Sequence, residues 1–271
     1  MQNLTIKRLN LLARQIKLLT LEISYLAKTG HVGSCLSIAE LLTVLYFSKM
    51  NIGKQNISSP GRDRFILSKG HAAAVLYTVL FKKGIITKKE LLSFGQDGGL
   101  CEHPEITQRG IEMSTGSLGH GLAFGAGIAL GNKIRKTEGN VYVLISDGEC
   151  GEGSVWEAAA FASRMKLDNL VAILDYNDWQ CFGRTSEVTN PEPVVKRWQN
   201  FGFATYKVDG HSTRDIKRAF QKLPHKNKPS IIIAHTVSGR GVPLIEDKLI
   251  GHYKVFSDDE YKQAKKELEL L

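Results

Sequence analysis

Apolar residues along the chain follow two spacings in turn, one typical of strands and the other of helices. Short apolar runs that are typical of buried strands lie at 63–70, 140–146, 169–176, 203–209 and 230–237. Helical spacing covers 1–30, 37–50, 71–84, 88–95, 119–136, 153–166, 213–223 and 257–271. Ser37 and Glu40 have the spacing of a capping box, which predicts that the second helix begins at Ser37. The alternation predicts a single α/β domain over residues 1–271, a mostly parallel sheet with helices on both faces.

Composition narrows the class of protein. The chain has 271 residues, of which 42% are hydrophobic and 23% are charged, as in an ordinary globular domain. It has no run of eighteen apolar residues, and its amphipathic start predicts a helix rather than a signal peptide, so no membrane partner is expected. Four scattered cysteines without a CxxC pair argue against disulfides and zinc, and they favour a cytoplasmic protein. The net charge of +9 is dispersed, which argues against nucleic acid as a partner.

Two of the buried runs each end in a small side chain that carries oxygen. Asp147 follows one run and Asn177 follows the next, with a helical stretch between them. Ligands bind at the carboxyl ends of parallel strands, and a right-handed crossover brings two such strands close together. A carboxylate, an amide and the glycine-rich start of the helix at Gly148 together suit a diphosphate with Mg²⁺. The simpler interpretation is that Asp147 caps the helix and that Asn177 begins a turn.

The combination resembles the thiamine diphosphate motif, which is Gly-Asp-Gly followed by Asn after a helix and a strand, with Ser146 here in place of the first Gly. Over its whole length the chain is similar to the N-terminal half of transketolases of the split-gene type. The matching segments include "AKTGHVGSCLSIAELLTVLY", "DRFILSKGHAAAVLY", "CEHPE", "MSTGSLGHGLAFGAGIAL", "NDWQCFGRT" and "IIAHTVSGRGVPLIEDK". The resemblance implies the thiamine diphosphate-binding (PP domain) fold. It also implies transfer of a two-carbon ketol unit from a ketose, or a ketose phosphate, to an aldose.

The same resemblance assigns cofactors and the residues that hold them. Thiamine diphosphate is the implied cofactor, together with Mg²⁺, or Ca²⁺ or Mn²⁺ in its place. The implied metal ligands are Asp147, Asn177 and the backbone carbonyl of Trp179. Glu152 matches a glutamate at the dimer interface, although it could equally be a carboxylate that favours a helix N-terminus. The implied cofactor-binding positions are His71, Gly116, Ser117, Leu118, Gly148, Glu149, Glu152 and Asn177.

Three histidines are the expected catalytic residues. By resemblance, His31 faces the reacting sugar hydroxyls, His103 contacts the C1 hydroxyl of the ketose, and His252 lies near the diphosphate and the substrate. The match at His252 is weaker, because "EDKLIGHYKVF" lacks the usual Trp before His. Imidazole suits this reaction because its ordinary pKa of about 6.5 lets it take and return a proton at neutral pH.

A complete transketolase is more than twice as long as this chain. The half that is missing here carries the glutamate beside the aminopyrimidine and the arginines for the sugar phosphate. The resemblance therefore implies a C-terminal, pyrimidine-binding partner subunit in an α₂β₂ heterotetramer. Other interpretations are an α subunit of a 2-oxo acid dehydrogenase, a relative of deoxyxylulose phosphate synthase, and a homologue without enzymatic activity. The order of "TGHVG", "LSKGHA" and "CEHPE" favours a transketolase, while the donor and acceptor sugars stay open.

Overall fold

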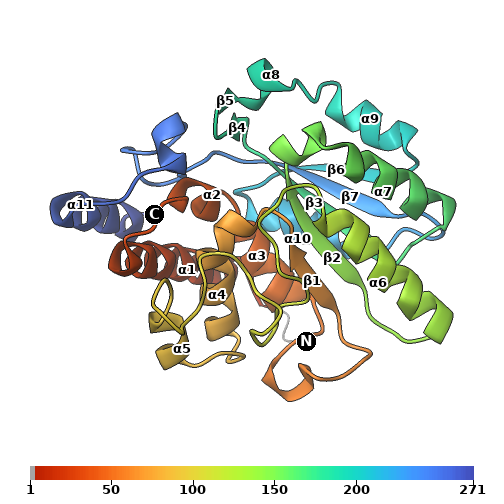
Figure 1. Ribbon diagram of the computed structural model, residues 1–271, viewed down its shortest axis with the longest axis horizontal. Coiled ribbons are helices and arrows are strands. Elements are labelled where there is room, and N and C mark those ends of the chain that lie inside the picture. The colour runs from red at the N-terminus through yellow and green to blue at the C-terminus, as the bar shows by residue number, and fades with distance from the viewer. Residues whose placement is uncertain (1–3) are drawn as a thin grey trace.

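The computed structural model describes residues 4–271, and its centre is a sheet of five parallel strands. Figure 1 shows helices on both sides of this sheet, which confirms the predicted fold class. Its central strands are mostly apolar because both faces are covered. In spatial order the strands are β1 (Arg64–Leu67), β2 (Val141–Ser146), β3 (Leu170–Tyr176), β7 (Ser230–His235) and β6 (Ala204–Asp209).

One face of the sheet is covered by helices from the N-terminal third of the chain and by one later helix. Alternate strand residues such as Leu67, Leu144 and Ile173 point into this layer and form one hydrophobic core with the helices. The helices of this core are α1 (Ile6–Ala27), α3 (Ala39–Val44), α4 (Ala73–Lys82) and α10 (Thr213–Gln221). The short helix α5 (Lys88–Leu92) follows α4 and begins with a capping box at Thr87.

The opposite face carries a second core, in which small residues let helices approach the strands closely. Its helices are α6 (Gly121–Arg135), α7 (Gly153–Arg164) and α9 (Val194–Asn200). A Cβ atom on Gly125 would lie 2.4 Å from Cγ2 of Val143, so α6 packs directly on β2. This contact explains why the sequence of α6 is rich in Ala and Gly.

A third, smaller core joins the two ends of the chain. The C-terminal helix α11 (Asp258–Glu269) packs beside α1, and Figure 1 shows it outside the main body of helices. A capping box formed by Ser257 and Glu260 begins this helix. The core also includes Val242 and Ile245 from the long segment that follows β7. This segment ends in a short 3₁₀ helix, Leu249–His252, which carries the last predicted catalytic residue.

The predicted helix over 37–50 is wrong in its start and its continuity. The structure has a short helix α2 (Val32–Ser37), then α3 from Ala39, then a π-helical turn at Leu45–Lys49. Ser37 ends α2 instead of capping a helix, because its hydroxyl donates to Ser34 O and to a buried carboxylate on β3. A tertiary contact has therefore replaced the local capping interaction.

Short elements between β3 and β6 were not predicted. They are the hairpin strands β4 (Trp179–Gln180) and β5 (Gly183–Arg184) and the helix α8 (Thr185–Val188), followed by α9. The hairpin continues directly from the end of β3, at the edge of the sheet where Asn177 lies. No helix in residues 4–271 combines the length and hydrophobicity needed to cross a membrane.

Candidate active site

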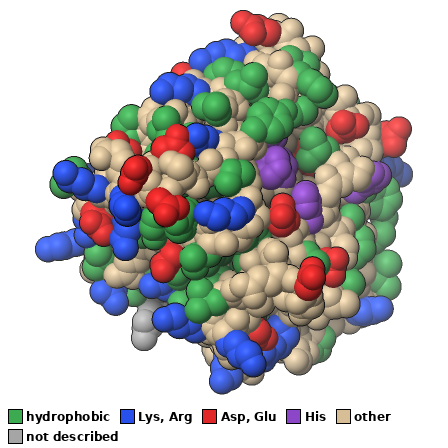
Figure 2. All heavy atoms as spheres, turned by 60° about the vertical axis from the view of Figure 1, so that its left-hand side comes forward, with side chains coloured by type: hydrophobic (Ala, Val, Ile, Leu, Met, Phe, Trp, Pro, Cys, Tyr) green, Lys and Arg blue, Asp and Glu red, His purple; other side chains and the backbone are tan. Residues whose placement is uncertain are grey.

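Segments that follow four of the parallel strands meet at the carboxyl edge of the sheet. They carry His71 after β1, Asp147 after β2, Asn177 after β3 and Thr236 after β7. A cleft of about 350 Å³ opens there, and Figure 2 shows histidine side chains close together at the surface. Most of the predicted site residues line this cleft, namely His31, His71, His103, Gly116, Leu118, Gly148, Glu152, Asn177, Trp179 and His252.

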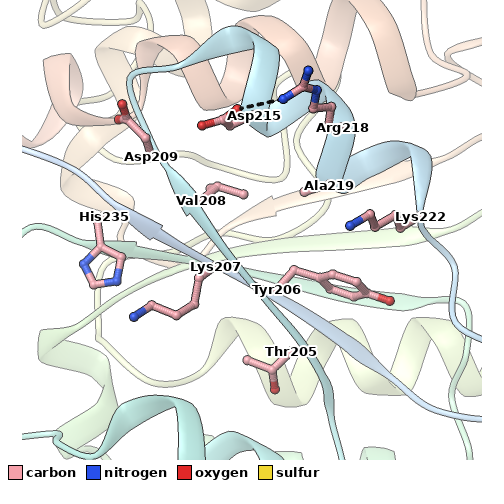
Figure 3. A pocket seen from close by; sticks show the side chains of 10 residues that line it. All are labelled: Thr205, Tyr206, Lys207, Val208, Asp209, Asp215, Arg218, Ala219, Lys222 and His235. Atoms are coloured by element: carbon pink, nitrogen blue, oxygen red, sulfur yellow. Dashed lines mark ion pairs between the residues drawn. The ribbon is translucent and has the colours of Figure 1, made fainter.

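A larger groove of about 690 Å³ lies elsewhere, between the outer edge of β6 and α10. Figure 3 shows Lys207 and His235 on one side of the strand and the Asp215–Arg218 ion pair of α10 on the other. None of the predicted site residues lines this groove. A charged residue such as Lys207 on an edge strand discourages the addition of a further strand. The smaller cleft, which the predicted site residues line, is therefore the candidate active site.

Asp147 lies where β2 passes into the next helical turn, and its side chain is fully buried. Its carboxylate accepts hydrogen bonds from the backbone N–H of Gly148 at 2.9 Å and of Asp178 at 2.6 Å. The second bond joins the end of β2 to the loop after β3, so the two predicted ligand segments are in contact. Burial raises the pKa of Asp147 to about 7, and the neighbouring Asp175 carboxylate acts in the same direction. The charge of Lys69 and the two backbone hydrogen bonds act in the opposite direction but do not outweigh burial.

Asn177 and Trp179 are held firmly from both sides. Asn177 donates from Nδ2 to Asp175 at 2.7 Å and accepts from the backbone N–H of Trp179 at 2.9 Å. The indole N–H of Trp179 donates to Asp247, and the guanidinium of Arg184 stacks 4.3 Å from the centre of the indole ring. Arg184 also forms two hydrogen bonds of 3.1 Å with Asp247. This cluster ties the hairpin to the segment after β7, and it fixes the backbone whose carbonyl is the third predicted metal ligand.

Directly behind Asn177 lies a buried ion pair that sequence reasoning missed. Lys69 Nζ lies 2.6 Å from Asp175 Oδ2, and both side chains have 0% exposure. Burial by itself would raise the pKa of Asp175, yet the charge of Lys69 and the hydrogen bonds to the carboxylate hold it below its usual value. Two signals in the sequence could have identified the pair. Asp175 is the one charged residue of the mostly apolar strand β3, and Lys69 stands two positions after the end of β1.

The imidazoles of His31, His71 and His252 form a closely packed cluster on one wall of the cleft. Their ring centroids are 5.1 Å apart for His31 and His71, 4.9 Å for His31 and His252, and 5.2 Å for His71 and His252. Burial lowers the pKa of all three, and in each case the neighbouring charge of Lys69 adds to the effect. The pKa of His252 falls to about 4. All three rings are therefore neutral at pH 7 and can both donate and accept hydrogen bonds.

The backbone at His31 is strained in a way that presents its ring to the cleft. His31 has φ of +61° at the start of α2, and its backbone N–H donates to His252 O at 3.1 Å. This left-handed conformation costs a non-glycine residue about 1–2 kcal/mol. Behind it, a Cβ atom on Gly33 would lie 2.8 Å from Gly251 O, so only glycine lets the two segments meet. Within the described chain, His31 Nδ1 is buried and has no hydrogen-bond partner, which leaves it available to a ligand.

Two of the predicted cofactor-binding residues lie outside the cleft lining. The carboxylate of Glu149 is buried and accepts from the backbone N–H of Ser146 and of Gly119, both at 2.8 Å, and from the hydroxyl of Ser68. Its side chain thus fastens the loop before α6 to the end of β2, so any contact with a ligand must come from its backbone. Ser117 is exposed beside the lining residues of the same loop. Lining residues that sequence reasoning did not single out are Ser34, Lys69, Ser146, Gln180, Cys181 and Phe182.

A parallel α/β sheet with a carboxylate, an amide and a histidine cluster at its carboxyl edge defines a domain that binds a diphosphate cofactor. Residues 9–270 match the family described as "Transketolase, thiamine diphosphate binding domain", and the chain belongs to the transketolase family. It is 41% identical over 249 residues to one subunit of the apulose-4-phosphate transketolase of Phocaeicola vulgatus, with 91% of this chain and 89% of that protein covered. It is 39% identical over 260 residues to the 6-deoxy-6-sulfo-D-fructose transketolase subunit SqwG of a Clostridium species, with coverage of 95% and 94%.

Longer relatives match along part of their length. Human transketolase is 41% identical over 251 residues, which cover 89% of this chain and 39% of the human protein. The crystal structure of Campylobacter jejuni transketolase superposes with a TM-score of 0.92 at 29% identity, covering 98% of this chain and 43% of that one. The Pichia stipitis enzyme in complex with sedoheptulose 7-phosphate gives 0.88 at 30% identity, covering 96% and 40%. The chain corresponds to the N-terminal, thiamine diphosphate-binding subunit of the split type, a transferase subunit that needs a partner.

Proposed function

We propose that residues 1–271 form one domain that acts as the diphosphate-binding half of a two-chain transketolase. With a C-terminal, pyrimidine-binding partner it transfers a two-carbon ketol unit from a ketose, or a ketose phosphate, to an aldose acceptor. The observation that carries this proposal is the cleft in which Asn177 lies with three packed, neutral imidazoles, while the buried Asp147 accepts a hydrogen bond from the loop directly after Asn177. Relatives matched over most of both lengths are named as single subunits of transketolases, and this supports the two-chain form.

A divalent cation is the proposed partner of Asp147, Asn177 and the backbone carbonyl of Trp179. Mg²⁺ is the first choice, with Ca²⁺ or Mn²⁺ able to replace it. The described residues contain no group of three or more His, Cys, Asp or Glu side chains suited to a metal. The proposed ligands are therefore one carboxylate and two neutral oxygens. Such oxygen ligands suit Mg²⁺, which completes its shell with substrate or cofactor phosphate. The burial of Asp147 supports this proposal, because burial disfavours the ionised carboxylate and a cation in contact with it would offset that cost.

Thiamine diphosphate, when bound, supplies the carbanion and the electron sink for the carbon–carbon cleavage. His71 would hold the diphosphate, since its Nε2 is already fixed 3.1 Å from Ser34 Oγ and its other ring nitrogen faces away from that contact. Gly148 would bring its backbone close to the same group. The loop of Gly116, Ser117 and Leu118 would pass the aminopyrimidine, as the resemblance implies.

Proton handling falls to the two histidines packed beside His71 in the cluster, His31 and His252. Burial keeps both rings neutral, so a ring nitrogen of His31 or His252 is free to accept a proton from a sugar hydroxyl and return it to the acceptor. His252 is a weak base with its pKa of about 4, so His31 is the better candidate for the base. His103 lines the same cleft and would bind the ketose hydroxyl next to the reacting carbon. Water is kept from this chemistry only when the open side of the cleft is covered, and this is a task for the partner.

Several apolar side chains on the outer side of α6 and α7 support assembly with other chains. Phe124 and Ile134 of α6 are 40% and 71% exposed, and Phe161 of α7 is 44% exposed. Figure 1 shows these two helices side by side at the outside of the fold. Exposed apolar surface of this kind marks interaction sites. We propose an α₂β₂ heterotetramer in the cytoplasm, in which this surface is buried.

The direct test is two-carbon transfer by the chain alone and with a pyrimidine-binding subunit from the same source. Each sample receives thiamine diphosphate, Mg²⁺ and a panel of ketose donors and aldose acceptors. We expect no transfer by the chain alone and robust transfer near a one-to-one ratio. Robust transfer without the second polypeptide would overturn the two-chain form, and silence of the mixture with every pair of sugars would overturn the activity.

A matched pair of variants tests the proposed surface. Phe124 on α6 and Leu92 on α5 are both 40% exposed, but α5 lies on the other side of the sheet. Phe124→Asp should weaken assembly by about tenfold or more, as loss of a buried aromatic contact does at interfaces. Leu92→Asp should leave assembly unchanged. Equal behaviour of the two variants in sedimentation velocity would contradict the proposed surface.

A further inference from the structure

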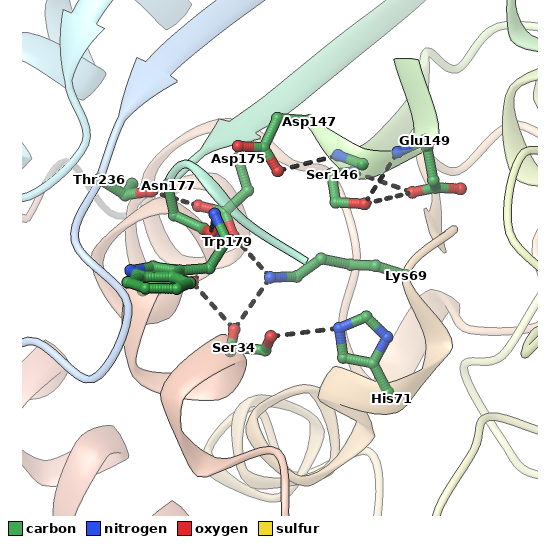
Figure 4. Close-up of polar contacts among 12 residues, drawn as sticks. Ser34, Lys69, His71, Ser146, Asp147, Glu149, Asp175, Asn177, Trp179 and Thr236 are labelled. Carbon is green, nitrogen blue, oxygen red and sulfur yellow. Dashed lines mark hydrogen bonds and ion pairs between the residues drawn. The ribbon is translucent and has the colours of Figure 1, made fainter. Parts of the chain in front are cut away.

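Asp175 is the point at which four segments of the chain are tied together behind the cleft. Its carboxylate is fully buried, and Figure 4 shows the groups that converge on it. Oδ2 accepts from Lys69 Nζ at 2.6 Å, from Asn177 Nδ2 at 2.7 Å and from the Ser37 hydroxyl at 2.8 Å. Oδ1 accepts from the hydroxyl of Thr236. These donors come from the ends of β1, β3, α2 and β7, so one carboxylate joins most of the carboxyl edge of the sheet.

Stability alone does not account for this ion pair. Burying an ion pair costs the free energy of removing two charges from water. A protein with apolar residues of similar volume in place of the pair is often as stable or more stable. Asp175 stands on β3 between Leu174 and Tyr176, which pack into the core on the opposite face of the sheet, and its own side chain is surrounded by four polar groups. The pair of Lys69 and Asp175 is therefore better explained by what it holds in place.

The carboxylate determines which way the amide of Asn177 points. An ionised carboxylate can only accept hydrogen bonds, so the group 2.7 Å from Asp175 must be the NH₂ of Asn177. The amide oxygen then points away from Asp175, to the side where it accepts from the backbone N–H of Trp179. Trp179, whose backbone carbonyl is another proposed metal ligand, lies on that side.

The lysine extends the same arrangement to the histidine cluster. Lys69 Nζ also donates to the backbone carbonyl of Ser34 at 3.0 Å. The hydroxyl of Ser34 lies 3.1 Å from Nε2 of His71. Figure 4 shows this chain of contacts from Asn177 through Asp175, Lys69 and Ser34 to His71. The start of α2 and the ring of His71 are thus held by the same buried pair that orients Asn177.

We infer that Asp175, held by Lys69, is a positioning residue that keeps the amide oxygen of Asn177 turned toward the metal. This inference rests on the proposed metal site. Asp175 acts through its hydrogen bond to the ligand and touches neither metal nor substrate. Partners of this kind orient a ligand, and their loss weakens metal binding even though every ligand is still present.

The test is the replacement Asp175→Asn in the complex with the pyrimidine-binding subunit. Asn keeps the shape but removes the charge that holds Lys69, and its single oxygen must accept from Lys69, Ser37 and Asn177 together, so the hydrogen bond that orients the ligand amide is weakened. We expect the Mn²⁺ affinity, measured by electron paramagnetic resonance in the presence of thiamine diphosphate, to fall by about 10- to 100-fold. Thiamine diphosphate binding, measured by calorimetry, should then need a correspondingly higher Mn²⁺ concentration.

Asp63→Asn is the matched control. Asp63 is 5% exposed and accepts from the backbone N–H of Asn51 and Asn140, both at 2.7 Å. It lies at the other end of β1, away from the cleft. Both variants should lower the melting temperature, but only Asp175→Asn should lower Mn²⁺ affinity. Unchanged Mn²⁺ affinity in a folded Asp175→Asn variant would overturn the inference. If the wild-type complex itself binds cofactor without any divalent cation, the proposed metal site fails instead.

A double variant separates orientation from a general loss of structure. In Asp175→Asn with Asn177→Asp, the carboxylate now stands at position 177 and presents an oxygen to the metal however it turns. The neighbouring amide can still donate to it, and the net charge is that of the wild type. If Asp175→Asn folds, the Mn²⁺ affinity of the double variant should be at least about tenfold higher than that of Asp175→Asn. If Asp175→Asn does not fold, the double variant should still bind Mn²⁺ measurably. A double variant that binds Mn²⁺ no better than the folded single variant, or does not bind it at all, would overturn the inference.

Discussion

The histidine cluster should make the fold less stable as the pH falls below neutrality. His252 lies against His31 and His71, and burial, the charge of His31 and that of Lys69 lower its pKa to about 4. An unfolded histidine has a pKa of about 6.5. Between these two values the unfolded chain binds the proton and the folded chain does not. The stability is therefore complete above pH of about 6.5 and is lost as the pH falls toward 4.

The size of this effect follows from the two pKa values. Lowering the pH from 7 to 5 should remove about 1 to 2 kcal/mol of the free energy of unfolding through His252 alone, and the lower figure allows for solvent at a partly exposed ring. His31 and His71 add to the loss, because their pKa values are lowered too. Replacing His252 by Gln removes its share and also takes away one of the charges that lower the pKa of His71.

Urea unfolding of the cofactor-free chain at pH 7 and at pH 5 measures the loss. The wild type should lose more free energy of unfolding over this interval than His252→Gln, by about 1 to 2 kcal/mol. His225→Gln serves as the control, since His225 is exposed in the loop after α10 and lies outside the cleft. Equal losses in the wild type and in His252→Gln would refute the reasoning. A titration of His252 near pH 6.5 by nuclear magnetic resonance would do the same.

Other predictions concern the cofactor and its supports. Asp147→Ala should lower metal-dependent cofactor affinity by more than about 100-fold, because losing a direct metal ligand weakens binding more than losing a residue that orients a ligand. Wild-type affinity in a cofactor titration would contradict the metal assignment. His103→Ala should lower kcat/KM for the ketose by about tenfold with cofactor affinity kept, whereas His71→Ala should chiefly weaken cofactor binding; equal effects on both quantities would show that these roles are misplaced. Asp247→Ala removes the hydrogen-bond acceptor of the Trp179 indole, so the Mg²⁺ concentration at half-saturation should rise by up to about fivefold. No change in that concentration would mean that the cluster does not support the ligand carbonyl of Trp179.

Much of the fold could be predicted from the sequence because its strands and helices follow local periodicity. The apolar run ending at Tyr176 is a central strand, and the Ala/Gly-rich stretch from Gly121 is a helix that lies on β2. The ends of the strands could be predicted as well, since a small polar residue after an apolar run marks the carboxyl edge of a parallel sheet. Asp147 and Asn177 were placed in this way, and their segments are in contact.

The break in the predicted helix over 37–50 shows where local rules fail. Ser37 and Glu40 have good capping spacing, but Ser37 donates to Asp175 on a strand 138 positions away. Glu40 in turn pairs with Lys17 of α1 at 2.7 Å. Both side chains satisfy partners that no short window of sequence contains, so the helix begins and ends where tertiary contacts require.

The sequence by itself determined the residue types of the site: a carboxylate and an amide at strand ends, and histidines beside glycines. The tertiary structure alone decided which of them share a cleft and what holds them there. Lys69 and Asp175 are 106 positions apart, and although each stands out beside an apolar run, no local pattern says that they pair with each other. They become a buried pair because β1 and β3 flank β2 in the sheet and α2 closes over their ends. The physical reason is that periodicity predicts which residues of a helix or strand face the interior. Which partner such a residue contacts there depends on the order of the strands in the sheet.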